Sequence, residues 1–304
     1  MAQNQPETHR GQLYYGGQAV LEGVMIRGPT SMAIACRRPD GELAVHSETL
    51  GGVYTGRVRR IPFVRGVVVL WETLALGMRA LFFSSNVALG QEDKEVSGGA
   101  MWSTVVIALV LVAGIFFAGP VFLTSWLEGH IDSASLVVTI EGVIRLVMLI
   151  GYIWAIGFMP DIKRVFAYHG AEHKAIHALE AGDRLEPGAV QRYSTAHIRC
   201  GTSFLLTVMV VAIVVFVAVG APDLWLRVLS RVLLLPVIAS ISYEIIRFTG
   251  RNEKSVVVRW LMKPNLALQS LTTRQPDDRQ VEVALRALNE VLAAEGVQPS
   301  RSAP

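Results

Sequence analysis

Charged residues are scarce in this sequence. Asp, Glu, Lys and Arg make up only 17% of its 304 residues, whereas about a quarter is usual for a soluble domain. Hydrophobic residues make up 52% of the chain, and the mean hydropathy is +0.42. This balance excludes a disordered or collagen-like chain and favours a protein embedded in a lipid bilayer.

Cysteine, a signal peptide and a basic patch are also lacking. With only Cys36 and Cys200 a disulfide framework is excluded, and we interpret both as free thiols or metal ligands. Residues 1–13 contain no short apolar core, so we expect no secretory signal peptide and a chain that begins in the cytosol. The net charge of +3 is spread along the sequence, and no nucleic-acid partner is expected.

Long apolar runs, by contrast, are frequent. A bilayer core about 30 Å thick needs roughly 20 apolar residues in a helix, and four runs reach that length: 102–127, 135–159, 201–221 and 224–246. The sequence therefore predicts a mainly α, polytopic membrane protein with about four transmembrane helices. Charged residues inside the second and fourth runs should face protein, water or headgroups, and Glu141 and Arg145 are expected to pair.

The segment 61–83 is apolar as well, but Arg65, Glu72 and Arg79 recur in it every seventh residue. On a helix this spacing forms one polar stripe, which favours an amphipathic helix lying in the membrane interface. A fifth transmembrane span is the alternative. It would place the first 60 residues on the opposite side of the membrane.

The distribution of basic residues predicts the orientation in the membrane. Ten Lys and Arg lie in residues 1–100, six in 160–199 and nine in 247–304. The two short turns that would face outward, 128–133 and 221–223, contain none. Because cytoplasmic loops carry the excess of Lys and Arg, we expect a multi-pass protein of the inner membrane with both termini in the cytoplasm.

Patterns outside the apolar runs predict the remaining elements. The turn Arg38-Pro39-Asp40-Gly41 should join a β-hairpin, preceded by a strand at Gln18–Arg27. Pro276-Asp277-Asp278 should cap a docking helix that ends near Ala294. We divide the chain into a β-rich region (1–60), an interfacial helix and linker (61–100), a four-helix membrane domain (101–246) with an insert (160–199), and a helical tail (247–304).

Three histidines and a carboxylate recur at helical spacing in the insert. At about 100° per residue, His169, His173, His177 and Glu180 share one face of a helix, and Glu172 lies beside His169. Two histidines four residues apart are one helical turn apart, the separation from which both can bind one transition metal ion. A histidine-rich interfacial anchor is the alternative interpretation.

The segment His169–His173 has the form H-x-x-E-H, the inverted zinc-protease signature. There two histidines hold the metal and the glutamate handles the proton of a water molecule. Further ligands must come from outside this helix, and His197 and Cys200 are the nearest supply. We predict a divalent transition metal, expected to be zinc, on His169, His173, His197 and Cys200, with Glu172 as catalytic base. The reserve ligands are His177, Glu180, Asp161 and Glu244.

Four blocks of sequence carry a family resemblance: GGQAVLEGVMIRGP (Gly16–Pro29), YHGAEHKAIHALE (Tyr168–Glu180), HIRCGTSF (His197–Phe204) and LTTRQPDD (Leu271–Asp278). In this order they resemble the YqhQ-like proteins, a bacterial membrane family of unknown function described as predicted metal-dependent enzymes. The resemblance covers almost the whole chain. It implies roles for Glu22, His169, Glu172, His173, His197 and Cys200.

Two functional hypotheses follow. The first is a metal-dependent enzyme, a hydrolase with its site at the cytoplasmic membrane face. The second is a non-enzymatic membrane factor, in protein insertion or envelope assembly, with a structural metal or a polar histidine network. An open coordination position favours the first and a closed shell of four ligands favours the second. The expected partners are the lipid bilayer and either a membrane protein or a second copy of this chain.

Overall fold

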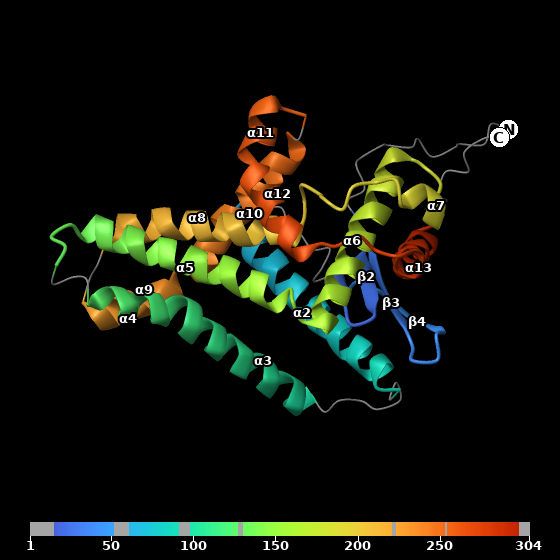
Figure 1. Cartoon of the computed structure of the whole chain (residues 1–304), viewed down its shortest axis with the longest axis horizontal. Coiled ribbons are helices and arrows are strands. Elements are labelled where there is room, and N and C mark those ends of the chain that lie inside the picture. Colours follow the sequence, from blue (N-terminus) through green and yellow to red (C-terminus); the bar gives the residue numbers. More distant parts are fainter. Residues whose placement is uncertain are drawn as a thin grey trace.

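The computed structural model describes residues 15–51, 61–90, 98–126, 130–220, 223–252 and 254–297. Long helices form one part of the molecule, and a small sheet covered by further helices forms the other (Figure 1). The mainly α fold with a small β region is confirmed. Four helices are long and apolar enough to cross a membrane, as predicted, although they are not the same four.

The sheet has four antiparallel strands in the order β1 (Gly16–Val20), β2 (Gly23–Arg27), β3 (Ser31–Arg37) and β4 (Leu43–Thr49). The predicted hairpin across Pro39-Asp40-Gly41 is confirmed as β3 and β4. The single strand predicted over Gln18–Arg27 is wrong, because the chain turns back at Leu21 and Glu22 to form β1 and β2. This turn has no glycine at its left-handed position, which Glu22 occupies with φ 51°.

Both faces of the sheet are buried. Alternate residues of β3 point to opposite sides: Ala33 and Ala35 pack against α6 (Pro160–Ala181) and α13 (Asp278–Ala294). Met32 and Ile34 pack on the other face, against α2 (Val64–Ala88). The docking helix predicted near the C-terminus is α13, and Asp277 caps it with a reciprocal capping box.

Three predicted spans are continuous in the structure. The first is Ser103–Ser125, which is formed by α3 (Gly98–Ala113), the π-helix η2 (Gly114–Ala118) and α4 (Gly119–Ser125). The other two are α5 (Ala134–Ile156) and α8 (Gly201–Val219). The fourth predicted span, 224–246, is not one continuous helix, although its two parts together are long and apolar enough for one bent span. It consists of α9 (Leu224–Leu233) and α10 (Leu235–Arg251), which meet at a bend of 44°. Pro236 follows the bend, and proline cannot donate the backbone hydrogen bond of a continuous helix.

Helix α2, over the segment predicted to be interfacial, is the fourth candidate span by length and composition. The charged residues of its polar stripe pair with protein groups: Arg65 with Glu244 of α10, Glu72 with Arg27 of β2, and Arg79 with Glu48 of β4. Leu50, before α2, and Val87, near its end, pack in the same cluster on the sheet. The interfacial placement of this segment and its alternative as a fifth span both stay predictions.

The predicted pair of Glu141 and Arg145 is present and belongs to a larger buried group. Glu141 lies 2.8 Å from Arg145 and 3.0 Å from Arg231, with Arg227 at 3.9 Å. All four side chains are at most 1% exposed. The single carboxylate thus holds α5 against α9 in the membrane part, while Phe216 of α8 stacks under the guanidinium groups of Arg145 and Arg231.

We predict that the sheet, the insert and α13 lie on one side of the membrane. Glu42, Glu186 and Arg286 are exposed on these parts, and Asp132 is exposed in the turn before α5. Single cysteines at the four positions should label in two classes with a membrane-impermeant maleimide, Asp132→Cys alone in one class. Cys36 and Cys200 are buried and give little background. Labelling of any other position together with Asp132→Cys contradicts this arrangement.

We also predict that Glu141→Gln destabilises the protein by about 3–5 kcal/mol, the usual range for removing one partner of a buried ion pair. Three buried arginines would then lack their common carboxylate. The measurement is the unfolding of purified protein in detergent. Glu290→Gln is the control, because it breaks only the exposed pair with Arg286, and such a surface pair contributes about 1 kcal/mol or less. Equal stability of the two variants would exclude this role for Glu141.

Candidate metal centre

Helix α6 carries the histidine face beside an apolar face. Its apolar face, which includes Tyr168, Ala171 and Ala175, is buried against the sheet and α13. The helix begins with Pro160 in its first turn and ends at Gly182, which adopts the left-handed conformation with φ 68°. The burial of one face therefore sets the direction in which the neighbouring histidine face points, toward the segment before α8 and toward α12 (Lys263–Thr272).

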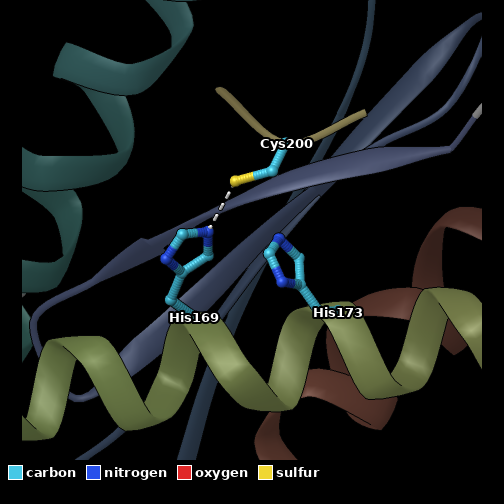
Figure 2. A group of neighbouring side chains, drawn as sticks. All are labelled: His169, His173 and Cys200. Atoms are coloured by element: carbon cyan, nitrogen blue, oxygen red, sulfur yellow. Dashed lines mark hydrogen bonds between the residues drawn. The ribbon is translucent and has the colours of Figure 1, made fainter. Parts of the chain in front are cut away.

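His169, His173 and Cys200 converge. The imidazole centroids of the two histidines are 4.4 Å apart, and Nε2 of His169 lies 3.1 Å from Sγ of Cys200. One ligand atom from each of the three residues lies within 4.8 Å of the others, a spacing that could hold one metal ion. Figure 2 shows both rings rising from α6 toward the sulfur. The spacing predicted for His169 and His173 is thus found, and Cys200 faces the pair.

Backbone carbonyls orient both rings. Nδ1 of His169 donates to the carbonyl of Thr272 at 2.9 Å, and Nδ1 of His173 donates to the carbonyl of Thr195 at 2.6 Å. A proton on each Nδ1 leaves the lone pair of each Nε2 available on the side of Cys200. Histidines that bind metals are usually held in this way, with the second nitrogen donating to a carbonyl or carboxylate.

Cys200 is the N-cap of α8 and its thiol is buried. Burial raises the pKa of this thiol, but protonated His173 and the hydroxyl and amide of Thr202 favour the thiolate more strongly, so the pKa of Cys200 is below its ordinary value. The thiolate is the form of cysteine that binds metals. The surroundings of Cys200 therefore promote the form that a metal site needs.

Glu172 lies next to this group. Its Oε2 is 3.5 Å from Nε2 of His173, and its side chain is 6% exposed. Strand β1 can pass close to it only because residue 17 is glycine: a Cβ on Gly17 would lie 2.7 Å from Cγ of Glu172. The glutamate is thus confined between α6 and the sheet with its carboxylate directed at His173.

The structure places His197 in a second group, with His177 and Glu180. Nδ1 of His197 accepts the backbone N–H of Arg199, so Nε2 carries the proton and faces Glu180 at 3.5 Å. Burial raises the pKa of Glu180, but His197 and Arg199 lower it more, and the net pKa is below the ordinary value. His197 is thus oriented as a hydrogen-bond donor in this group. Its predicted role as a ligand beside His169 stays a prediction.

Three other candidates lie outside both groups. Glu22 pairs with Arg164 and accepts a hydrogen bond from Tyr168, while Glu244 pairs with Arg65. Asp161 is exposed in the first turn of α6. Sequence reasoning missed the residues that orient the rings. Of these, Thr272 lies within the block LTTRQPDD, but it acts through its backbone carbonyl, which no side-chain pattern reports.

A cavity of about 760 Å³ opens beside the metal group. His169, Glu172, His173 and Cys200 line one wall, and residues of the sheet, α2 and α10 line the others. The donor atoms are therefore accessible from a space large enough for a small organic molecule.

Comparison with known proteins places the chain in a family without an assigned function. The family model described as "Protein of unknown function (DUF1385)" matches residues 61–294. "Uncharacterized protein YqhQ" of Bacillus subtilis (strain 168) is 36% identical over 315 residues, which cover 97% of this chain and 98% of the relative. No solved structure matches. The chain belongs to the DUF1385 family and is similar to YqhQ over nearly its full length.

Proposed function

We propose that this protein is a metal-dependent hydrolase whose site lies at the cytoplasmic face of the cell membrane. The observation that supports it is the convergence of two oriented imidazoles and a thiol beside a cavity that also contains Glu172. The distribution of Lys and Arg supports the cytoplasmic placement of the site and of both termini.

The donor set suits zinc. Two nitrogens and one sulfur are ligands that zinc accepts in tetrahedral sites, and catalytic zinc sites have three protein ligands with the fourth position open. Within the described residues the group contains three donors, and the cavity adjoins them. This arrangement supports a catalytic site over a closed structural one.

The residues around the donors have separate tasks in this proposal. A bound divalent metal ion would supply Lewis-acid activation of a water molecule. Glu172, buried and next to His173, accepts the proton from the attacking water and can return it to the leaving group. The carbonyls of Thr195 and Thr272 keep the imidazole lone pairs directed at one point.

A structural metal in a non-enzymatic membrane factor is the second candidate. The three donors come from α6 and from the residue before α8, and α12 holds His169 through Thr272. An ion there would clamp the insert onto the membrane helices, and binding would be coupled to the order of the insert. Such a role needs no catalytic base, so Glu172 distinguishes the two candidates.

We predict that the metal depends on three side chains. His169→Ala, His173→Ala and Cys200→Ser should each lose most of the metal measured by elemental analysis of the purified protein, because each removes one of three ligands. His177→Ala and His197→Ala are matched controls from the second group and should retain it. Loss of metal in His197→Ala would instead show that the second group binds the ion or shares it. A metal-free wild-type protein would contradict the proposal.

We predict that Glu172→Gln retains the metal and the fold but loses activity by about 100-fold or more, the usual contribution of a general base. The amide has nearly the same shape as the carboxylate and cannot accept the proton. Hydrolysis is measured on a panel of chromogenic phosphate and carboxylate esters, with Glu180→Gln as the control. A metal-loaded Glu172→Gln protein with unchanged turnover would exclude the hydrolase mechanism and favour a structural metal.

A further inference from the structure

The cavity beside the metal group lies between two helices that diverge from one crossing point. At Gly66 the backbones of α2 and α10 touch, since a Cβ there would lie 2.8 Å from Cα of Ser240. Beyond the crossing, Val69, Thr73 and Leu76 of α2 line the cavity, one helical turn after another. On the α10 side the residues that line the cavity also recur at helical spacing, at positions 243, 246, 247, 250 and 251. The two helices thus form the sides of a V that opens toward the metal group.

Arginine dominates the charge of this cavity. Among the lining residues Glu172 is the only carboxylate. Four arginines line the cavity as well: Arg27, Arg199, Arg247 and Arg251. Arg27 pairs with Glu72 and Arg199 with Glu180. For Arg247 and Arg251 no ion pair is found with a carboxylate in the described parts of the chain. Arginine binds phosphate through paired hydrogen bonds, so the cavity is complementary to a phosphate group.

The outer surfaces of the same two helices are apolar. Trp71 of α2 is 60% exposed and Phe248 of α10 is 62% exposed. Large exposed side chains of this kind continue along α2 at Val64, Val67, Leu70 and Leu74. An apolar surface of this extent on a membrane protein is expected to face lipid. The arginine-lined cavity therefore lies directly behind helices whose outer faces suit the acyl chains of a bilayer.

We propose that the cavity binds a phosphate ester carried on a membrane lipid. The phosphate contacts Arg247 and Arg251 beside the metal group, and the acyl chains leave between α2 and α10 into the membrane. The claim that this lipid is the substrate rests on the proposed hydrolase. The claim that the cavity binds the lipid does not. The proposal identifies the substrate class as a phospholipid or another lipid phosphate, taken directly from the bilayer.

The test is lipid binding by the purified full-length protein in detergent, followed by fluorescence anisotropy. The probes are a short-chain fluorescent phosphatidic acid and the matching diacylglycerol, which lacks the phosphate. We expect phosphatidic acid to bind at least about tenfold more tightly, a difference that a pair of charge-assisted hydrogen bonds can supply. Glycerol 3-phosphate, a phosphate ester without acyl chains, should compete weakly. Equal binding of the two lipids, or equally tight binding of glycerol 3-phosphate, would overturn the proposal.

Matched variants locate the binding site. The double variant Arg247→Gln, Arg251→Gln should lose about tenfold or more in affinity for phosphatidic acid, while Arg259→Gln on the exposed face of α11 (Val256–Leu261) should not. Thr73→Trp should block the cavity, and Leu74→Trp, the neighbouring residue outside its lining, should not. Unchanged binding in the arginine double variant and in Thr73→Trp would place the lipid elsewhere and overturn the proposal.

A further comparison separates this inference from the proposed hydrolase. Phosphatidic acid should bind to Glu172→Gln at least as tightly as to wild type, because this variant retains the arginines and removes the only carboxylate among the lining residues. Binding that depends on Arg247 and Arg251 in a protein without hydrolytic activity would support the lipid site and refute the enzyme. Hydrolysis of water-soluble esters, together with phosphatidic acid binding that is unaffected by the arginine variants, would support the enzyme and refute the lipid site.

Discussion

The burial of both faces of a four-stranded sheet is the constraint on which the rest of this structure depends. A sheet with Ala33 and Ala35 on one side and Met32 and Ile34 on the other cannot leave either face in water. One face requires α6 and α13, and the other requires α2. Because α6 directly follows α5, the packing of α6 on the sheet brings segments from both ends of the chain to the end of the membrane helices. The candidate metal group and its cavity form where these parts meet.

Local patterns predicted much of the fold and the proximity of two histidines. His169 and His173 could be paired from the sequence because their relation depends only on the helical repeat, and the hairpin of β3 and β4 depends only on its turn. The orientation of His197 could not be predicted. Its backbone is held by Gln269, 72 residues away, and its ring is held by the N–H of Arg199. Contacts of this kind leave no periodicity in the sequence.

The same distinction applies to the membrane part. A polar stripe on an apolar helix has the same spacing whether it faces headgroups or protein, so Arg65, Glu72 and Arg79 could not identify their partners. Hydrophobicity also identified residues 224–246 as one apolar run. The bend coincides with Pro236, and the clustering of three arginines around Glu141 depends on how α9 lies beside α5 and η2. Composition averaged over a window cannot show either feature.

The close passage of β1 over Glu172 at Gly17 has a consequence for how the protein can be divided. The family model begins at residue 61, yet strands β1 and β2 form a wall of the cavity through Gly17, Met25 and Arg27. A chain trimmed to residues 61–294 would expose Glu172 to solvent and remove the sheet against which α6 and α13 pack. The segment that the family model matches is therefore shorter than the smallest piece that can enclose the site.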